Sequence, residues 1–90
     1  MQITDVRIRI QSPDGESRVK ATASIVIDGA FVVHELRVVD GANGVFVEMP
    51  RRKNSAGEYL DVAHPISVEA RDAVQKAVLE AYREARVKVS

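Results

Sequence analysis

The sequence predicts an α+β fold, in which an antiparallel β-meander of about four to five strands is followed by a C-terminal amphipathic helix packed on one face. Two observations predict it. Apolar and polar residues alternate with the period of a β-strand in the first half of the chain, and an apolar stripe with helical spacing runs from Ile66 to Ala85. At 90 residues, the whole chain, residues 1–90, has the length of a single domain.

Tight-turn signals separate the predicted strands. Residues 2–11 and 17–28 alternate, and a short fourth strand begins at residues 45–47 and ends before Pro50, which cannot donate a hydrogen bond to a sheet. Each turn contains glycine together with aspartate or asparagine, the residues that best tolerate a positive φ. The three turns are predicted at Pro13-Asp14-Gly15, Asp28-Gly29 and Gly41-Ala42-Asn43-Gly44.

The first two turns also predict how the first three strands pair. If each turn has two central residues, Ile8 faces Ala21 and Ala21 faces Leu36, so that apolar residues gather on one side of the sheet. The same registers place His34 on that side, opposite Ala23. We therefore expect His34 to be a buried histidine with a hydrogen-bond partner.

The segment Phe31–Asp40 is apolar on both sides of the predicted strand, and one helix can cover only one side. An exposed apolar patch of this size marks an interface, and a small domain has a modest core. We therefore expect a homodimer, formed by stacking of sheets or by pairing of strand edges. The alternative is that the C-terminal segment or the Arg51–Gly57 loop covers this side within the monomer. The residues expected at the dimer interface are Val26, Phe31, Val33 and Val39.

The second half of the chain predicts a loop, a short strand and the helix. Arg51–Gly57 is polar and ends in glycine, which indicates a loop, and Glu58–Val62 indicates a short edge strand. The pair His64-Pro65 cannot continue a helix, because proline forces the preceding residue toward extended angles. Ser67 is a suitable N-cap, so the helix is predicted over about residues 67–85.

No set of residues predicts a catalytic centre. The chain has no cysteine, and neither His34 nor His64 has a partner at the spacing that zinc sites require. Asp61 precedes His64 by three residues and could orient its imidazole, but bracing of the corner between strand and helix is the simpler interpretation. No serine lies in a nucleophile motif. We therefore expect a protein without enzymatic activity, cofactor or metal.

The charges balance overall but cluster locally. Lys and Arg number 13, and Asp and Glu number 13, which argues against a protein that coats nucleic acid through bulk charge. Aromatic residues make up 4% of the chain, too few for a platform that stacks single-stranded bases. Arg51-Arg52-Lys53 is nevertheless a run of three cations, and further cations share one side of the first hairpin. A side that carries like charges either splays them into water or binds an anion.

A dimer would double these cationic patches and allow them to grip the phosphates of a duplex with weak sequence preference. The residues predicted to bind DNA are Arg51, Arg52, Lys53, Arg7, Arg9 and Lys20, with Arg9 expected opposite Lys20 and Arg37 beside it. The N-terminal segment carries no basic-then-apolar leader, and no apolar run approaches the length of a membrane span. We therefore expect a cytoplasmic protein.

Three segments of the sequence carry a family resemblance. They read TDVRIR (Thr4–Arg9), ASIVIDGAFVVHELRVVDGANGVFVEMP (Ala23–Pro50) and GEYLDVAHPI (Gly57–Ile66). Together they resemble the stage V sporulation protein G (SpoVG) family of bacterial septation regulators. The resemblance implies a small cytoplasmic α+β protein that dimerises and affects sporulation and septum formation, and several members prefer particular DNA sites. It also implies that Arg51, Arg52 and Lys53 form the basic segment of the family.

Residue pattern and resemblance together predict a dimeric DNA-binding regulatory protein that affects division-septum formation and sporulation or related gene expression. The alternative is a protein–protein interaction module of the septation machinery without direct DNA binding, which the balanced charge and the few aromatic residues favour. The expected partners are a second copy of the chain, double-stranded DNA bound weakly or through local patches, and regulatory proteins.

Overall fold

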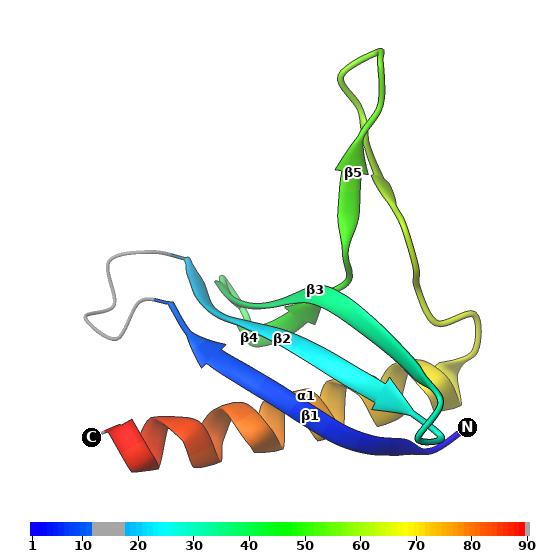
Figure 1. Cartoon of the computed structure of the whole chain (residues 1–90). Helices are drawn as coiled ribbons and strands as arrows, with labels where there is room; N and C mark the ends of the chain where they lie inside the picture. The colour runs from blue at the N-terminus through cyan, green and yellow to red at the C-terminus, as the bar shows by residue number, and fades with distance from the viewer. Residues whose placement is uncertain (12–17, 90) are drawn as a thin grey trace.

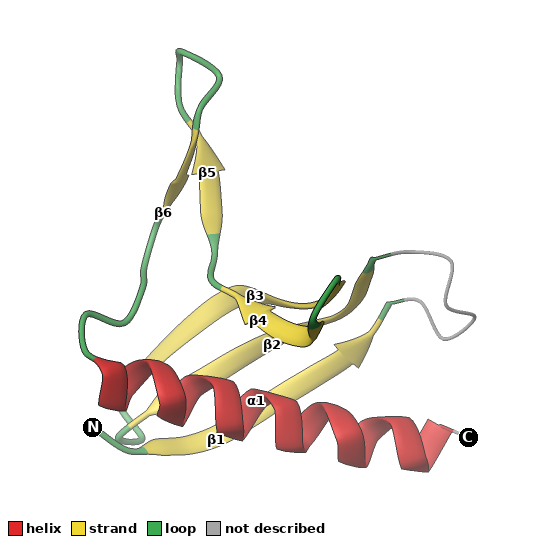
Figure 2. Ribbon diagram, turned by 180° about the vertical axis from the view of Figure 1, so that it is seen from behind, coloured by secondary structure: helices red, strands yellow, loops and turns green. Residues whose placement is uncertain are grey.

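The computed structural model describes residues 1–11 and 18–89, which form a four-stranded antiparallel sheet, a two-stranded sheet and one helix. The larger sheet has the strand order β1-β2-β3-β4, and β5 pairs with β6. In chain order the elements are β1 (Ile3–Ile10), β2 (Val19–Ile27), β3 (Phe31–Gly41), β4 (Gly44–Glu48), β5 (Arg51–Lys53), β6 (Tyr59–Asp61) and α1 (Val68–Val89). Figures 1 and 2 show α1 lying across one face of the larger sheet, so the predicted α+β meander with a C-terminal helix is confirmed.

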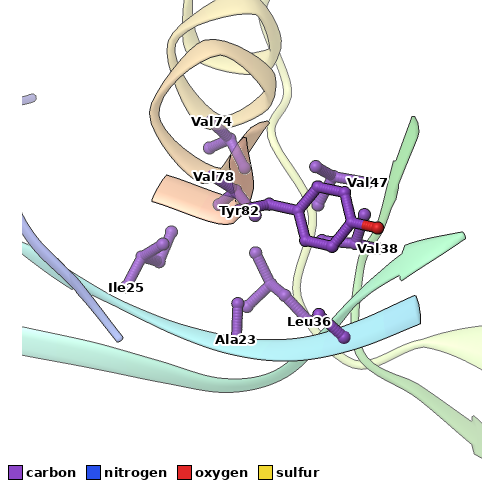
Figure 3. Close-up of a cluster of buried hydrophobic side chains, with 9 residues drawn as sticks. Ala23, Ile25, Leu36, Val38, Val47, Val74, Val78 and Tyr82 are labelled. Carbon is purple, nitrogen blue, oxygen red and sulfur yellow. The ribbon is translucent and has the colours of Figure 1, made fainter. Parts of the chain in front are cut away.

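The core lies between α1 and the face of the larger sheet that α1 covers. Ala21 and Ala23 of β2 are almost completely buried, and their small side chains let Val74 and Val78 of α1 come close to the strand. Figure 3 shows most of this cluster. Its members are Ala21, Ala23, Ile25, Leu36, Val38, Val47, Val74, Val78 and Tyr82. The opposite face of the larger sheet, which α1 does not cover, is called the open face below.

The first hairpin pairs two residues away from the predicted register. Ile8 lies opposite Ala23, where the prediction placed it opposite Ala21. The prediction was therefore wrong in register but right in face, because side chains alternate along a strand and a shift of two residues returns each one to its own side. The turn predicted at Pro13-Asp14-Gly15 lies outside the described residues.

The second turn lies at Asp28-Gly29 as predicted, but its loop is one residue longer than expected. The two residues have φ angles of 53° and 61°. Ile27 pairs with Phe31, and Ile25 pairs with Val33 instead of the preceding residue. A shift of one residue exchanges the two faces of a strand. Phe31 and Val33 therefore begin β3 on the side that α1 covers, and their predicted place on the other side was wrong.

A β-bulge in the middle of β3 shifts the register again. Between Ala23 and Ile25 of β2 the pairing slips, so that His34 and Glu35 together oppose Ser24 alone. Glu35 has a φ of 66°, a left-handed conformation that costs a residue other than glycine about 1–3 kcal/mol. The bulge adds one residue to β3 and so shifts the alternation of its side chains by one position. Apolar side chains therefore lie on the covered side both before and after the bulge.

The third turn and the fourth strand agree with the sequence. Gly41 pairs with Gly44, whose φ of 117° is readily adopted only by glycine. β4 ends at Glu48, before Pro50, as predicted. The ring of Phe46 lies against Gly41, where a Cβ atom would meet it at 2.8 Å. Glycine at position 41 therefore makes room for an aromatic side chain on β4.

The helix begins where predicted and ends later. The N–H of Ala70 donates a 3.1 Å hydrogen bond to Oγ of Ser67, which confirms Ser67 as the N-cap. The helix continues to Val89, beyond the predicted end near residue 85, because no glycine or proline follows Ala85 to terminate it.

The strands β5 and β6 form an arm that rises away from the larger sheet (Figure 1). Arg51–Lys53 was predicted to belong to a loop, but it pairs with Tyr59–Asp61 as an antiparallel hairpin. Asn54 stabilises the intervening turn, because its Oδ1 accepts hydrogen bonds of 2.9 Å from the N–H groups two and four residues later. The strand predicted at Glu58–Val62 is confirmed as β6. Among the described elements, β5 and β6 pack only against each other.

The side chain of Gln75 of α1 forms hydrogen bonds with the backbone at the outer edge of β4. An edge strand has N–H and C=O groups without a partner in its own sheet. The N–H of Val47 donates a 3.0 Å hydrogen bond to Oε1 of Gln75, and Nε2 of Gln75 donates a 3.0 Å hydrogen bond to the carbonyl of Val47. Val47 is only 5% exposed, so both groups depend on this amide rather than on solvent. The side chain thus fastens the helix to the sheet edge.

Replacing Gln75 by leucine should lower the free energy of unfolding by about 1–3 kcal/mol, because two buried backbone groups lose their partners. The neighbouring exposed substitution Lys76→Leu is the matched control and should change it by less than about 0.5 kcal/mol. Urea unfolding followed by circular dichroism measures both. Equal stabilities of the two variants would contradict this role of Gln75.

Candidate nucleic-acid interface

Two rows of polar residues cross the open face of the larger sheet. In one row Thr22 of β2 lies between Arg9 of β1 and Arg37 of β3. In the next row Arg7 lies opposite Ser24. The two rows place cations from two different strands around a strip of hydroxyl groups.

The prediction that Arg9 lies opposite Lys20, with Arg37 beside Lys20, was wrong. The observed registers differ from the predicted ones, so that Thr22 takes the place expected for Lys20. Threonine separates the two arginines, so no two like charges are direct cross-strand partners in this row. Lys20 itself lies at a register shift of β2 and is half-buried. Its carbonyl accepts a 2.9 Å hydrogen bond from the N–H of Gln11, so Gln11 and not Arg9 is its neighbour across the hairpin.

His34 lies on the open face and not in the core. The bulge turns it outward, and its Nδ1 lies 3.0 Å from Oγ of Ser24. The predicted burial of His34 opposite Ala23 was wrong, because Leu36 takes that position after the bulge. The sequence contains no clear signal of this exchange, since a bulge at a glutamate lacks the usual glycine.

The rows border a shallow concavity of about 610 Å³ on the open face. Thr22 accepts a 3.3 Å hydrogen bond from Nε2 of Gln11, so its hydroxyl oxygen is oriented by the chain that follows β1. The lining residues are Arg7, Ile8, Arg9, Thr22, Ala23, Ser24, His34, Glu35 and Arg37. Only Arg7 and Arg9 of this set belong to the predicted DNA-binding residues. Alternation of Thr22 and Ser24 with buried alanines was the signal that could have added both hydroxyls.

The carboxylates near these arginines are partly engaged. Oδ2 of Asp5 lies 3.4 Å from Nε of Arg7, an exposed ion pair. Glu48 lies opposite Arg37 in the strand register, but its carboxylate is 3.7 Å from Arg51. Within residues 1–11 and 18–89, Arg9 and Arg37 have no carboxylate within ion-pair distance. The open face therefore presents two arginines that make no ion pair with a described acid.

The three cations of the arm are not equivalent. Arg51 lies between two carboxylates, 3.7 Å from Glu48 and 3.3 Å from Asp61. Nζ of Lys53 lies 6.0 Å from the ring centroid of Tyr59. The side chain between them on β5, Arg52, alternates to the other side of the arm, opposite Leu60. Of the three, Arg52 alone has neither a carboxylate nor a ring as partner in the part of the chain that the structure describes.

The second histidine lies in the corner between the arm and the helix. Nδ1 of His64 is 3.1 Å from the carbonyl oxygen of Pro65, which fits the predicted bracing role. His64 also lines a cavity of about 280 Å³ together with Asp61 and Arg71. Asp61, however, is bound to Arg51. Among the described residues no group of three or more His, Asp or Glu side chains is arranged to hold a metal ion.

The structure separates the residues predicted at the dimer interface. Val26 lies half-buried on the open face, and Val39, on the same face, is buried beside Phe46 of β4. Val33 packs against the core, and Phe31, 75% exposed, lies on the side of the sheet that α1 covers. The four residues therefore do not form one continuous patch, and Phe31 is the most exposed of them.

Comparison with known proteins places the chain in a family. The sequence model of the SpoVG family matches residues 1–84, which span every described strand and most of α1. The chain belongs to the SpoVG family. No helix in the described part of this SpoVG-family chain is long and apolar enough to cross a membrane.

Several relatives are similar over most of their length and carry the name "Putative septation protein SpoVG". The relative from Caldicellulosiruptor bescii is 52% identical over 82 residues, 91% of each chain. The relative from Lachnospira eligens is 53% identical over 85 residues, 94% of each chain. The relative from Macrococcus caseolyticus is 54% identical over 84 residues, which cover 93% of this chain and 71% of that protein.

Proposed function

We propose that this SpoVG-family chain is a cytoplasmic regulatory protein of septation and sporulation or related gene expression, which binds double-stranded DNA as a homodimer. Membership of the family, whose relatives carry the name septation protein, supports the biological role. The observation that carries DNA binding is the gathering of cations outside the core of a chain with no formal net charge. Arg7, Arg9 and Arg37 meet on the open face, and Arg52 projects from the arm.

These cations suit contacts to phosphates more than contacts to bases. An arginine binds phosphate oxygens through two N–H groups, and such contacts position a protein on DNA without reading its sequence. Few aromatic residues accompany the cations, and Arg7, Arg9 and Arg37 lie on strands rather than on a helix. The proposed binding is therefore weak, sensitive to salt and mostly independent of sequence.

A second candidate function is that of a protein–protein interaction module. The observation that favours it is the exposed apolar surface of the arm and of the connection to the helix. Tyr59 and Leu60 are 63% and 55% exposed, and Val62 and Ile66 are 66% and 92% exposed. Exposed apolar residues on a projecting arm suit contact with another protein.

Alanine substitution of Arg51, Arg52 and Lys53 should weaken DNA binding and flatten its dependence on salt. Removing one cation that neutralises a phosphate reduces the slope of log affinity against log salt by about 0.9. Arg52→Ala alone should account for most of the decrease in affinity, because Arg51 is paired with two carboxylates. Fluorescence anisotropy with a labelled duplex between about 50 and 200 mM salt measures the effect.

The matched control removes three exposed cations from the helix, as Arg71→Ala, Lys76→Ala and Arg83→Ala. It lowers the net charge by the same amount and should leave the slope nearly unchanged. A wild-type protein that binds no duplex even at the lowest salt would refute DNA binding and favour the interaction module.

Sedimentation equilibrium of the wild type should give twice the 9.9 kDa mass of one chain. Phe31→Glu should shift the protein toward monomer, because a charge buried at an interface without a partner is costly. Val45→Glu, at an exposed valine of β4 that pairs with the far end of β3, is the control and should stay dimeric. A wild-type monomer at micromolar concentration would overturn the dimer.

A further inference from the structure

We propose that the concavity on the open face is a phosphate-binding site, in which Arg9 and Arg37 hold the anion, and Thr22 together with either Ser24 or His34 donates hydrogen bonds to it. The ligand is a phosphate group, carried by a nucleic-acid backbone or by a nucleotide. The inference deepens the proposed function and rests on it for the identity of the phosphate source, but the site can be tested without DNA.

The strand register lets the side chains of Arg9 and Arg37 reach the same point above Thr22. Arg9 and Arg37 flank Thr22 in a single cross-strand row, so their Cα atoms are separated by two strand spacings, about 10 Å. Both side chains point to the open face, which α1 does not cover. Two flexible guanidinium groups above a threonine can approach the same anion from opposite sides, each with two parallel donors.

Among the described residues Thr22 donates no side-chain hydrogen bond, so its donor is free for a ligand. Its hydroxyl oxygen accepts the 3.3 Å bond from the Gln11 amide. A hydroxyl group has one donor and two acceptor positions. Because Gln11 uses an acceptor position, the O–H of Thr22 remains available to an anion between the arginines.

The pair of Ser24 and His34 offers a donor in either tautomer of the neutral ring. Oγ of Ser24 and Nδ1 of His34 lie 3.0 Å apart. If the hydroxyl donates to Nδ1, then Nε2 carries the proton and becomes an N–H donor. If Nδ1 donates to the hydroxyl oxygen, the O–H of Ser24 is free to donate instead. The bulge at Glu35 creates this arrangement, because it sets His34 against Ser24.

The charge of the lining fits an anion with more than one negative charge. Three arginines line the concavity, and Glu35 is the only carboxylate among the described lining residues. Asp5 pairs with Arg7 from outside the concavity, at 3.4 Å, and partly offsets its field there. Arg9 and Arg37 make no ion pair with a described carboxylate, so the centre of the site lies between them.

The lining residues also indicate that the site does not recognise the base of a nucleotide. Among the described residues no phenylalanine, tyrosine or tryptophan lines the concavity, so a base would find no large ring to stack on. Its volume of about 610 Å³ is larger than inorganic phosphate requires and lies in the range of small-molecule sites, about 300–1,000 Å³. The site should therefore accept phosphates in a chain, pyrophosphate or a phosphodiester, with little preference for the base.

Titration calorimetry with pyrophosphate, adenosine diphosphate and a short DNA duplex tests the site. Arg9→Gln combined with Arg37→Gln should weaken the binding of every ligand that the wild type holds by about tenfold or more. Arg71→Gln combined with Arg83→Gln removes the same charge from α1 and should change binding less than about twofold. Thr22→Val keeps the β-branched shape, removes the donor and should weaken binding by about threefold. Thermal unfolding checks that each variant is folded.

The outcomes separate the site from the proposed function. Duplex binding tighter than that of adenosine diphosphate identifies nucleic acid as the source of the phosphate, and the reverse order identifies a nucleotide. Either result supports the site if the Arg9→Gln/Arg37→Gln variant no longer binds that ligand. Pyrophosphate binding that this variant loses, without any duplex binding, supports the site and refutes DNA binding. Duplex binding that is equal in the two double variants, with no pyrophosphate binding, overturns the site and leaves DNA binding standing.

Discussion

Packing of α1 on Ala21 and Ala23 buries one face of the larger sheet and leaves the other face without cover. The small side chains bring the helix close enough to make a compact core in a short chain, and Gln75 fastens the same helix to the outer edge of β4. Since α1 is the one helix of the described residues, it cannot also form a layer over the open face. The chemistry of that face is therefore free to serve a ligand or a partner.

The bulge in β3 decides which side chains the open face presents. Without it, the longer second turn would carry Leu36 and Val38 out of the core, because a shift of one residue exchanges the faces. With it, Val33 and Leu36 both face the helix, and His34 moves beside Ser24. The left-handed conformation of Glu35 is thus linked both to the integrity of the core and to the polar character of the concavity.

Much of this fold can be predicted from period and turn chemistry alone. Alternation along the strands, glycine at the turns and Ser67 before the helix indicated the order of elements and the covered face. Two features could not be predicted. The bulge has glutamate where glycine would signal it, and the arm is a hairpin held by Asn54, whose side-chain hydrogen bonds a polar loop does not reveal. Arg7 and Arg9 were predicted on the correct face, because they lie on a regularly alternating strand. His34 was predicted on the wrong face because the bulge was missed, and the three cations of the arm were predicted to be equivalent because its hairpin was missed.

We propose that phosphate binds to the open face and not to α1. An amide chemical-shift map of the isotope-labelled protein during titration with a short DNA duplex tests it most directly. We expect the largest shifts at Arg9, Thr22, Ser24, His34 and Arg37, with little change along the outer side of α1. Shifts concentrated on α1, with the open face unchanged, would contradict the account.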